Sequence, residues 1–173
     1  MHTFIIAAVA ENGVIGKDGN LTWSLPADQA FFFDRIKDAV LLTGRTSFES
    51  AHGTQTFQDL SKVIILTSRK DYDAGEAVVV HDLNSAFAAA KQLDLPELAI
   101  LGGAIVYEQC MDKADTLIIT EIHESFEGDT CFPSIDPEIW TETKRQFFKK
   151  DATNPYDFSF VEYKNRKIVK NHG

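Results

Sequence analysis

The sequence predicts an α/β protein built on a three-layer open sheet of about eight strands, mainly parallel, with an antiparallel C-terminal hairpin. Three observations support this fold class. Short apolar runs rich in β-branched residues recur along the chain, as is typical of buried strands. Segments with helical periodicity separate these runs, and such alternation indicates parallel βαβ units. Two further runs near the end have only a turn between them, which favours antiparallel pairing.

The expected elements can be placed in chain order. Strands are predicted at residues 3–9, 40–43, 63–67, 77–80, 98–101 and 116–122. Helices are predicted at residues 26–36, 46–51, 84–93 and 104–111. Pro26 opens the first helix, because the fixed φ of proline suits the first helical turn. The final hairpin pairs residues 140–149 with 158–164 around a turn at 151–155.

Length and composition indicate one compact domain. Of the 173 residues, 44% are hydrophobic and 25% are charged, values typical of soluble globular proteins. We expect a single domain at residues 1–164 and a polar, disordered tail at 165–173. The first apolar run, residues 4–10, is too short to cross a bilayer. We therefore expect a cytoplasmic monomer.

The acidic balance narrows the choice of partners. The formal net charge is -9 and the pI is about 4.9, so the surface repels phosphate backbones and anionic lipid headgroups. We expect no nucleic-acid partner and no membrane partner. A small anionic ligand remains compatible if a few cations and backbone N–H groups are well placed. Cys110, Cys131 and the five histidines form no metal-ligand spacing, and we expect no metal.

In open α/β sheets, ligands bind beyond the carboxyl ends of the strands, so the loops there are the expected place for a functional site. The loop at residues 10–23 is long and holds three glycines, which fits either a lid or a plain surface loop. Asp28 follows in the first turn of the predicted helix. It either complements the helix dipole or, beside Phe31 and Phe32 on the same face, binds a flat amidine-like ring.

Two anion sites are predicted after neighbouring strands. Gly44, Arg45, Thr46 and Ser47 offer N–H groups, a cation and hydroxyls at a helix start, and residues 67–69 repeat this composition. Such residues also form ordinary caps and turns. As a pair, the two segments suggest a ligand with two phosphate groups.

These motifs, in this order, resemble the dihydrofolate reductase family from about residue 4 to about residue 163. The matching segments are 6–8, 14–16, 23, 25–28, 43–46, 48–50, 65–68, 101–104, 106–107, 120 and 126–133. The resemblance implies NADPH-dependent reduction of 7,8-dihydrofolate to 5,6,7,8-tetrahydrofolate. The implied reaction is hydride transfer to the pterin with water-mediated protonation of its N5.

The resemblance also implies roles for single residues. Asp28 would hydrogen-bond the pterin, Thr120 would support it, and Trp23 would close the pocket and order a water molecule. The implied substrate wall consists of Ile6, Ala7, Phe32, Ala51 and Leu101.

The resemblance implies a cofactor site as well. Residues 11–23 would form the lid over the nicotinamide, braced by residues 128–129, and residues 102 and 103 would be joined by a cis peptide bond. The residues implied to bind NADPH are Ala8, Ile15, Gly16, Gly44, Arg45, Thr46, Ser47, Thr67, Ser68, Arg69, Leu101, Gly102, Gly103, Ala104, Ile105, Val106, Tyr107 and Thr130.

The sequence departs from the family where the glutamate tail of the substrate would bind. Ser61 stands where family members usually carry an arginine, and Phe33 stands where a basic residue is common. Arg35 and Lys62 are the candidate substitutes. Two alternatives therefore stay open: a reductase of a related pterin or ribosylated pyrimidine lacking the glutamyl tail, and a non-catalytic folate- or nucleotide-binding protein.

Overall fold

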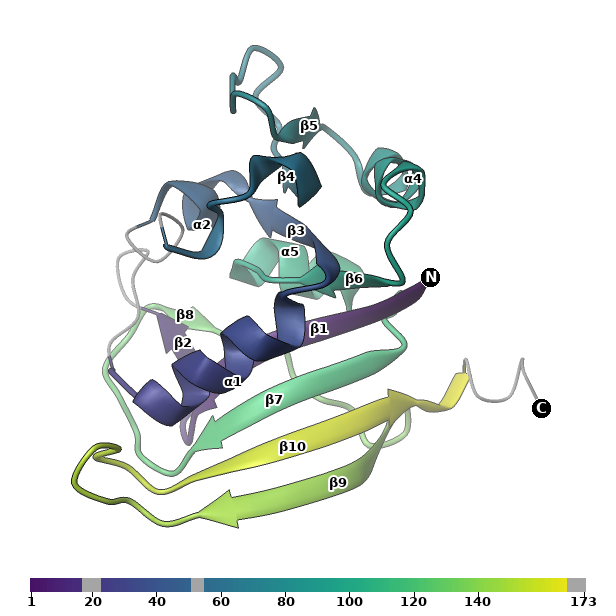
Figure 1. Cartoon of the computed structure of the whole chain (residues 1–173). Coiled ribbons are helices and arrows are strands. Elements are labelled where there is room, and N and C mark those ends of the chain that lie inside the picture. The colour runs from purple at the N-terminus through teal and green to yellow at the C-terminus, as the bar shows by residue number, and fades with distance from the viewer. Residues whose placement is uncertain (17–22, 51–54, 168–173) are drawn as a thin grey trace.

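The computed structural model describes residues 1–16, 23–50 and 55–167 and contains the expected mixed sheet (Figure 1). Its eight strands follow the order β5-β4-β3-β6-β1-β7-β10-β9. Their bounds are β1 (His2–Ala10), β3 (Ala39–Gly44), β4 (Val63–Leu66), β5 (Val78–Val80), β6 (Glu97–Ile100), β7 (Thr116–Ile122), β9 (Trp140–Phe148) and β10 (Phe158–Asn165). Each neighbouring pair from β5 through β7 is parallel, and β10 is antiparallel to both β7 and β9. The predicted fold class is confirmed.

Helices cover both faces of the sheet and make it the middle of three layers. One face carries α1 (Pro26–Ile36) and α2 (Arg45–Glu49), and the other carries α4 (Leu83–Gln92) and α5 (Ala104–Cys110). A short 3-10 turn, η1 (Leu60–Lys62), leads into β4.

The alternation of β1 explains why both faces need a cover. Phe4 and Ile6 pack in one apolar cluster with Ile36 of α1, whereas Ile5 packs in the other cluster with Ala86 of α4. Successive strand residues point to opposite faces, so a continuous apolar run buries both. The strand predictions rested on runs of this kind.

A small second sheet lies outside the predicted elements. Strand β2 (Val14–Gly16), within the segment expected to be a lid, pairs in antiparallel fashion with β8 (Thr130–Cys131). Gly128 lies against this ribbon so closely that an added Cβ would come within 2.6 Å of the Gly16 carbonyl oxygen. Residues 17–22 of the expected lid lie outside the described part of the chain.

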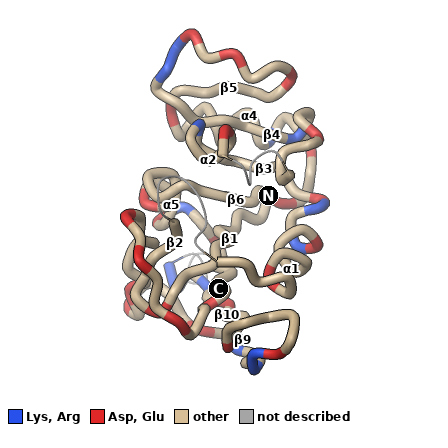
Figure 2. The backbone as a smooth tube through the Cα atoms, turned by 90° about the vertical axis from the view of Figure 1, so that its left-hand side faces the viewer, with Lys and Arg blue, Asp and Glu red and all other residues tan. Residues whose placement is uncertain are grey.

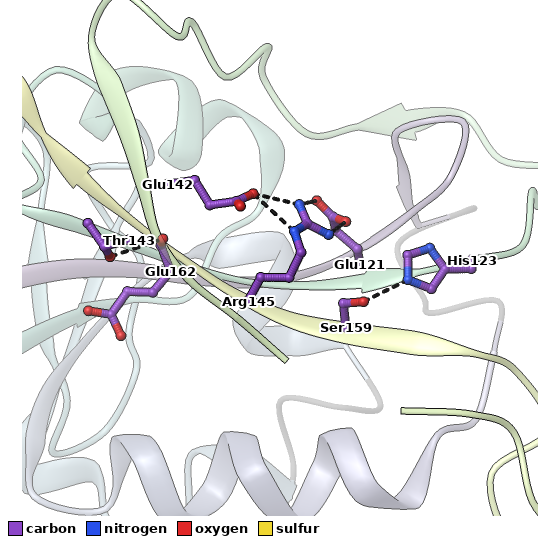
Figure 3. A network of polar contacts seen from close by, with 7 residues as sticks. All are labelled: Glu121, His123, Glu142, Thr143, Arg145, Ser159 and Glu162. Carbon is purple, nitrogen blue, oxygen red and sulfur yellow. Dashed lines mark hydrogen bonds and ion pairs between the residues drawn. The ribbon is translucent and has the colours of Figure 1, made fainter. Parts of the chain in front are cut away.

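The antiparallel edge of the sheet is held by a polar network (Figure 3). Arg145 on β9 donates to both carboxylate oxygens of Glu121 on β7, at 2.7 and 3.1 Å, and reaches Glu142 at 2.7 Å. Close by, His123 Nε2 lies 2.8 Å from Ser159 Oγ on β10. The network therefore ties three strands together at the edge.

Strand β10 runs one residue beyond the expected domain boundary. Asn165 is 1% exposed and donates its side-chain amide to the Ala114 carbonyl oxygen at 3.1 Å. Residues 168–173, which complete the predicted tail, are outside the described residues.

Charged residues are spread over the surface, with Asp and Glu distributed among the loops (Figure 2). Across residues 1–16, 23–50 and 55–167, no helix combines the length and the hydropathy needed to span a lipid bilayer. Cys110 is buried, Cys131 is exposed, and the two do not form a disulfide.

Candidate functional site

A large cavity opens beyond the carboxyl ends of the parallel strands, where the topology predicts ligand binding. Its volume is about 1160 Å³, and its wall combines β1, α1, α2, α5 and the segments that follow β4 and β5. Pockets that hold one small ligand usually have volumes of about 300–1,000 Å³, so this cavity is larger than one such ligand needs. The space therefore suits more than one small molecule at a time.

Asp28 on α1 and Thr120 on β7 meet at this cavity. The Thr120 hydroxyl donates a hydrogen bond of 2.6 Å to Asp28 Oδ1. Thr120 is 3% exposed, whereas Asp28 is partly exposed and lines the cavity. The sequence predicted both residues, and the structure brings them together although 92 positions separate them.

The environment of Asp28 makes ionisation of its carboxyl group less favourable than in water. Burial raises the pKa of the Asp28 carboxyl above its usual value of 3.8, and the Thr120 hydrogen bond offsets only part of this rise. Ile6 and Phe32, both apolar, line the cavity with it. A carboxyl of this kind binds a donor-rich, cationic or amidine-like ring most strongly when it is ionised, because the apolar wall leaves little water to compete.

Tyr107 forms the inner wall beside Asp28. Its hydroxyl lies 2.9 Å from the Ile6 carbonyl oxygen and 3.0 Å from the Leu101 carbonyl oxygen. Its burial and the nearby Asp28 charge raise the pKa of Tyr107, so it stays a neutral donor. Gly102 packs on its ring, since an added Cβ would lie 2.9 Å from Tyr107 Cε2.

The loops after β3 and β6 are tied together at the second half of the cavity. The Gly102 carbonyl oxygen accepts from the Gly44 N–H at 2.7 Å and from the Thr43 hydroxyl at 3.1 Å. The peptide bond between Gly102 and Gly103 is cis, as the resemblance implied. Side chains at two of these glycines would crowd the wall. A Cβ on Gly44 would lie 3.2 Å from Val106 Cγ2, and one on Gly103 would lie 3.3 Å from Ser47 Oγ.

Arg45 supplies positive charge to this half. Among the described residues that line the cavity, it is the only lysine or arginine. Its Nη1 lies 2.9 Å from Glu49 Oε2, and its side chain is 26% exposed. A guanidinium at the start of α2, beside backbone N–H groups, fits a phosphate.

The segment after β4 adds hydroxyls and an imidazole. The Thr67 hydroxyl accepts from the Arg69 N–H at 3.2 Å, and the Thr67 carbonyl oxygen lies 2.8 Å from His81 Nδ1. Because a carbonyl only accepts, His81 carries its proton on Nδ1. Ser68 and His81 both line the cavity.

Most predicted site residues line this one cavity. Those in its wall are Ile6, Ala7, Ala8, Ile15, Gly16, Asp28, Phe32, Gly44, Arg45, Thr46, Ser47, Thr67, Ser68, Leu101, Gly103, Ala104, Ile105, Val106, Tyr107 and Thr130. Thr120, Gly102 and Arg69 are not part of the wall, but each contacts a residue that is. Ala51 is outside the described residues.

Three predicted residues lie elsewhere. Trp23 is 8% exposed and packs on Phe126, with ring centroids 5.0 Å apart. Arg35 is held by Glu97 and is not part of the cavity wall. Lys62 donates to the Lys37 carbonyl oxygen at 2.7 Å and is not part of the wall either.

Sequence reasoning missed several wall residues. Phe57, Leu66, His81, Asp82 and Leu83 line the cavity without having been predicted to do so. Asp82 and Leu83 directly follow β5 with His81, at the carboxyl end of a parallel strand. The rule that ligands bind at such ends could have found them. Phe57 carries no comparable signal.

Comparisons with known proteins agree with this geometry. A sequence model of the family described as dihydrofolate reductase matches residues 2–165. A dihydrofolate reductase from Bacillus subtilis (strain 168) is 34% identical over 173 residues, covering 100% of this chain and 99% of that relative. Dihydrofolate reductase HdrB of Haloferax volcanii is 34% identical over 94% of this chain and 83% of its own.

A solved structure shares the fold. Dihydrofolate reductase from Enterococcus faecalis, complexed with NADP(H) and RAB-propyl, is similar with a TM-score of 0.85 and 35% identity. The similarity covers 95% of this chain and 96% of that one.

Proposed function

Because this chain belongs to the dihydrofolate reductase family, we propose that Asp28, supported by Thr120, is the group on which its catalysis depends. The protein is an NADPH-dependent oxidoreductase that reduces 7,8-dihydrofolate to 5,6,7,8-tetrahydrofolate. The observation that carries the proposal is the 2.6 Å contact between Thr120 and Asp28 at the cavity wall.

Asp28 binds the amidine-like edge of the pterin and stabilises positive charge on it. The pterin N5 must gain a proton during reduction, and a nearby carboxylate in an apolar wall makes that nitrogen more basic. Asp28 itself does not deliver the proton. A water molecule does so.

The second half of the cavity fits NADPH. Gly44 and Gly103 carry no side chain at positions where a Cβ would press on Val106 and Ser47, respectively. Their backbone can therefore come close to a ligand. Arg45, Thr46 and Ser47 would hold phosphate through charge, hydroxyls and N–H groups, while Ser68 and Arg69 would hold the 2′-phosphate. NADPH, when bound, supplies the hydride. The further residues proposed for this half are Ala8, Ile15, Gly16, Gly44, Thr67, 101–107 and Thr130.

The protein's own contribution is orientation and the exclusion of water. Ile15 and Gly16 of β2 line the cavity, so the β2–β8 ribbon forms one wall of the reaction space. Ile6, Ala7, Phe32, Ala51 and Leu101 would hold the pterin ring.

The substrate tail has no free arginine or lysine at the positions that the sequence singled out. Arg35 and Lys62, the sequence candidates to replace the arginine that Ser61 stands for, each contact another partner and could bind the tail only after leaving it, so in the present arrangement neither grips the substrate. Ser61 itself donates to Asp59 at 2.6 Å. Contacts to the tail add uniform binding, so a weaker grip raises KM more than it lowers kcat.

We further propose that residues 1–164 act as one domain in a cytoplasmic monomer. The net charge of -9 supports the absence of nucleic-acid and membrane partners.

A direct assay tests the function. The purified protein is mixed with NADPH and dihydrofolate, and loss of the nicotinamide absorbance is followed. We expect turnover that requires both compounds. The control is the same mixture without dihydrofolate, in which NADPH should not be consumed. If the protein binds NADPH but does not consume it when dihydrofolate is present, the proposal is contradicted and a non-catalytic binding protein is favoured.

A further inference from the structure

The first turn of α1 is capped by a residue from the other end of the chain. Leu25, its N-cap residue, makes no side-chain cap, and Pro26 has no N–H. The first free donor of the helix is therefore the N–H of Ala27. Asn154 accepts this hydrogen bond through Oδ1 at 2.9 Å, across 127 positions of sequence. Asn154 belongs to the turn between β9 and β10, which lies at the same end of the molecule as the start of α1 (Figure 1).

Asn154 is itself fixed in place. It is 9% exposed, and its backbone N–H donates to Asp151 Oδ1 at 2.7 Å. The same oxygen accepts from the Thr153 N–H at 2.8 Å. Asp157 closes the turn by accepting from the Lys150 N–H at 2.7 Å. An amide held at its backbone in this way presents its oxygen to α1 at little further entropic cost.

The same hairpin contacts α1 a second time. Phe160 of β10 stacks on Phe31 of α1, with ring centroids 4.2 Å apart and planes 17° apart. Phe160 is also the direct partner of Thr120 across β10 and β7. In the sequence, Asp28 therefore lies between Ala27 and Phe31, the two α1 residues that contact the hairpin. Strand β10 of the same hairpin pairs with β7, the strand that carries Thr120.

We propose that Asn154 is a positioning residue for catalysis, which holds the first turn of α1 so that the Asp28 carboxylate stays on the Thr120 hydroxyl. The inference rests on the proposed role of Asp28. Asn154 does not touch the cavity, so it acts only through the helix. Among the described residues, the titratable group that faces Asp28 is Tyr107 of α5. The titratable group of the hairpin turn is Asp151, whose exposed carboxylate accepts hydrogen bonds from backbone N–H groups.

Three variants test this inference. Asn154→Ala removes the acceptor, Asn154→Asp keeps an oxygen in its place, and Thr153→Ala alters an exposed side chain of the same turn. We expect Asn154→Ala to lower kcat for dihydrofolate about fivefold, which is the typical stability cost of a lost helix cap expressed as a change in rate. Because the Thr120 contact loosens, the pH profile of the rate should also move. Asn154→Asp and Thr153→Ala should stay within about twofold of the parent.

The readouts separate positioning from general loosening. NADPH affinity should remain unchanged in all three variants, since the cofactor half does not contact the hairpin turn. The carboxyl ¹³C shift of Asp28, titrated in the free protein, should show a changed pKa in Asn154→Ala and an unchanged one in Thr153→Ala. Asn154→Asp adds a negative charge next to Asp28, so only its rate is compared. An unmoved Asp28 titration, or a parallel loss of NADPH affinity, would overturn the inference.

The titration also keeps the two proposals distinguishable. If the parent fails to reduce dihydrofolate, the proposed role of Asp28 fails. A shifted Asp28 titration in Asn154→Ala would still show that the hairpin positions this carboxyl.

Discussion

Arg35 binds Glu97 through both terminal nitrogens, with Nη1–Oε1 and Nη2–Oε2 distances of 2.8 and 3.0 Å. Its guanidinium also lies over the Phe4 ring, 4.0 Å from the centroid. These contacts, one with the start of β6 and one with Phe4 of β1, hold the side chain near the amino ends of the parallel strands, and Arg35 is not part of the cavity wall. We therefore expect Arg35→Ala, and likewise Lys62→Ala, to leave the KM for dihydrofolate within about twofold of the parent. Steady-state kinetics checks this, and a tenfold rise would mean that the residue leaves its partner to bind substrate.

The same pair makes the fold sensitive to acid. The Arg35 guanidinium, with help from His2, holds the pKa of Glu97 below its usual value of 4.5. A lowered folded-state pKa contributes stability that is fully present above the ordinary pKa and is lost as the pH falls through the lowered one. Glu97→Gln should therefore cost up to about 1 kcal/mol near neutral pH and nothing in strong acid. Thermal unfolding across this pH range measures it. A loss independent of pH would point to packing instead.

Replacing the cavity carboxyl should separate binding from catalysis. Asp28→Asn keeps the size of the side chain and an acceptor for Thr120 but removes the negative charge. We expect turnover near neutral pH to fall on the order of 100-fold or more, with NADPH affinity unchanged. Acidification, which protonates the substrate directly, should restore part of the rate. Equal rates for variant and parent would contradict the role given to Asp28.

The same substitution should stabilise the fold. Burial raises the pKa of Asp28, and a raised carboxyl pKa means that stability is present below the ordinary value of 3.8 and is lost as the pH rises through the raised one. Asp28→Asn should therefore have a higher Tm than the parent at neutral pH and the same Tm in strong acid. Calorimetry at both pH values checks this. A lower Tm at neutral pH would show that the charge stabilises the fold.

Gly128 offers a steric test of the β2–β8 ribbon. A methyl group there would approach the Gly16 carbonyl oxygen to 2.6 Å, so one of the two backbones must move. We expect Gly128→Ala to cost about 1–3 kcal/mol of stability and to weaken NADPH binding, because Ile15 and Gly16 line the cavity. Ser125→Ala, an exposed change in the same segment, is the matched control. Unaltered NADPH affinity in Gly128→Ala would separate the ribbon from the cofactor site.

Much of this architecture could be predicted because a continuous apolar run indicates a strand that is buried on both faces. The run at residues 3–9 became β1, and its alternating clusters on both faces are what a central parallel strand requires. Strands β2 and β8 have three and two residues, too few for a pattern to register. Asp28 was found from its place in the first turn of a helix beside aromatic residues.

The partners of Arg35 and Asn154 could not be predicted. Glu97 is 62 positions from Arg35, and Ala27 is 127 positions from Asn154. Polar side chains carry no periodicity, and a turn asparagine is ordinarily explained by the turn itself. Only the folded register of the sheet decides which distant backbone such a side chain meets.

The double contact between α1 and the last hairpin has a consequence for synthesis. On the ribosome, residues 26–36 emerge long before Asn154 and Phe160 do. Until Asn154 and Phe160 have emerged, α1 lacks both the hydrogen bond that caps its first turn and the ring that stacks on Phe31. The wall of the cavity cannot be completed before that point. A nascent chain of this protein should therefore acquire the ability to bind a pterin late, when translation has passed the final turn.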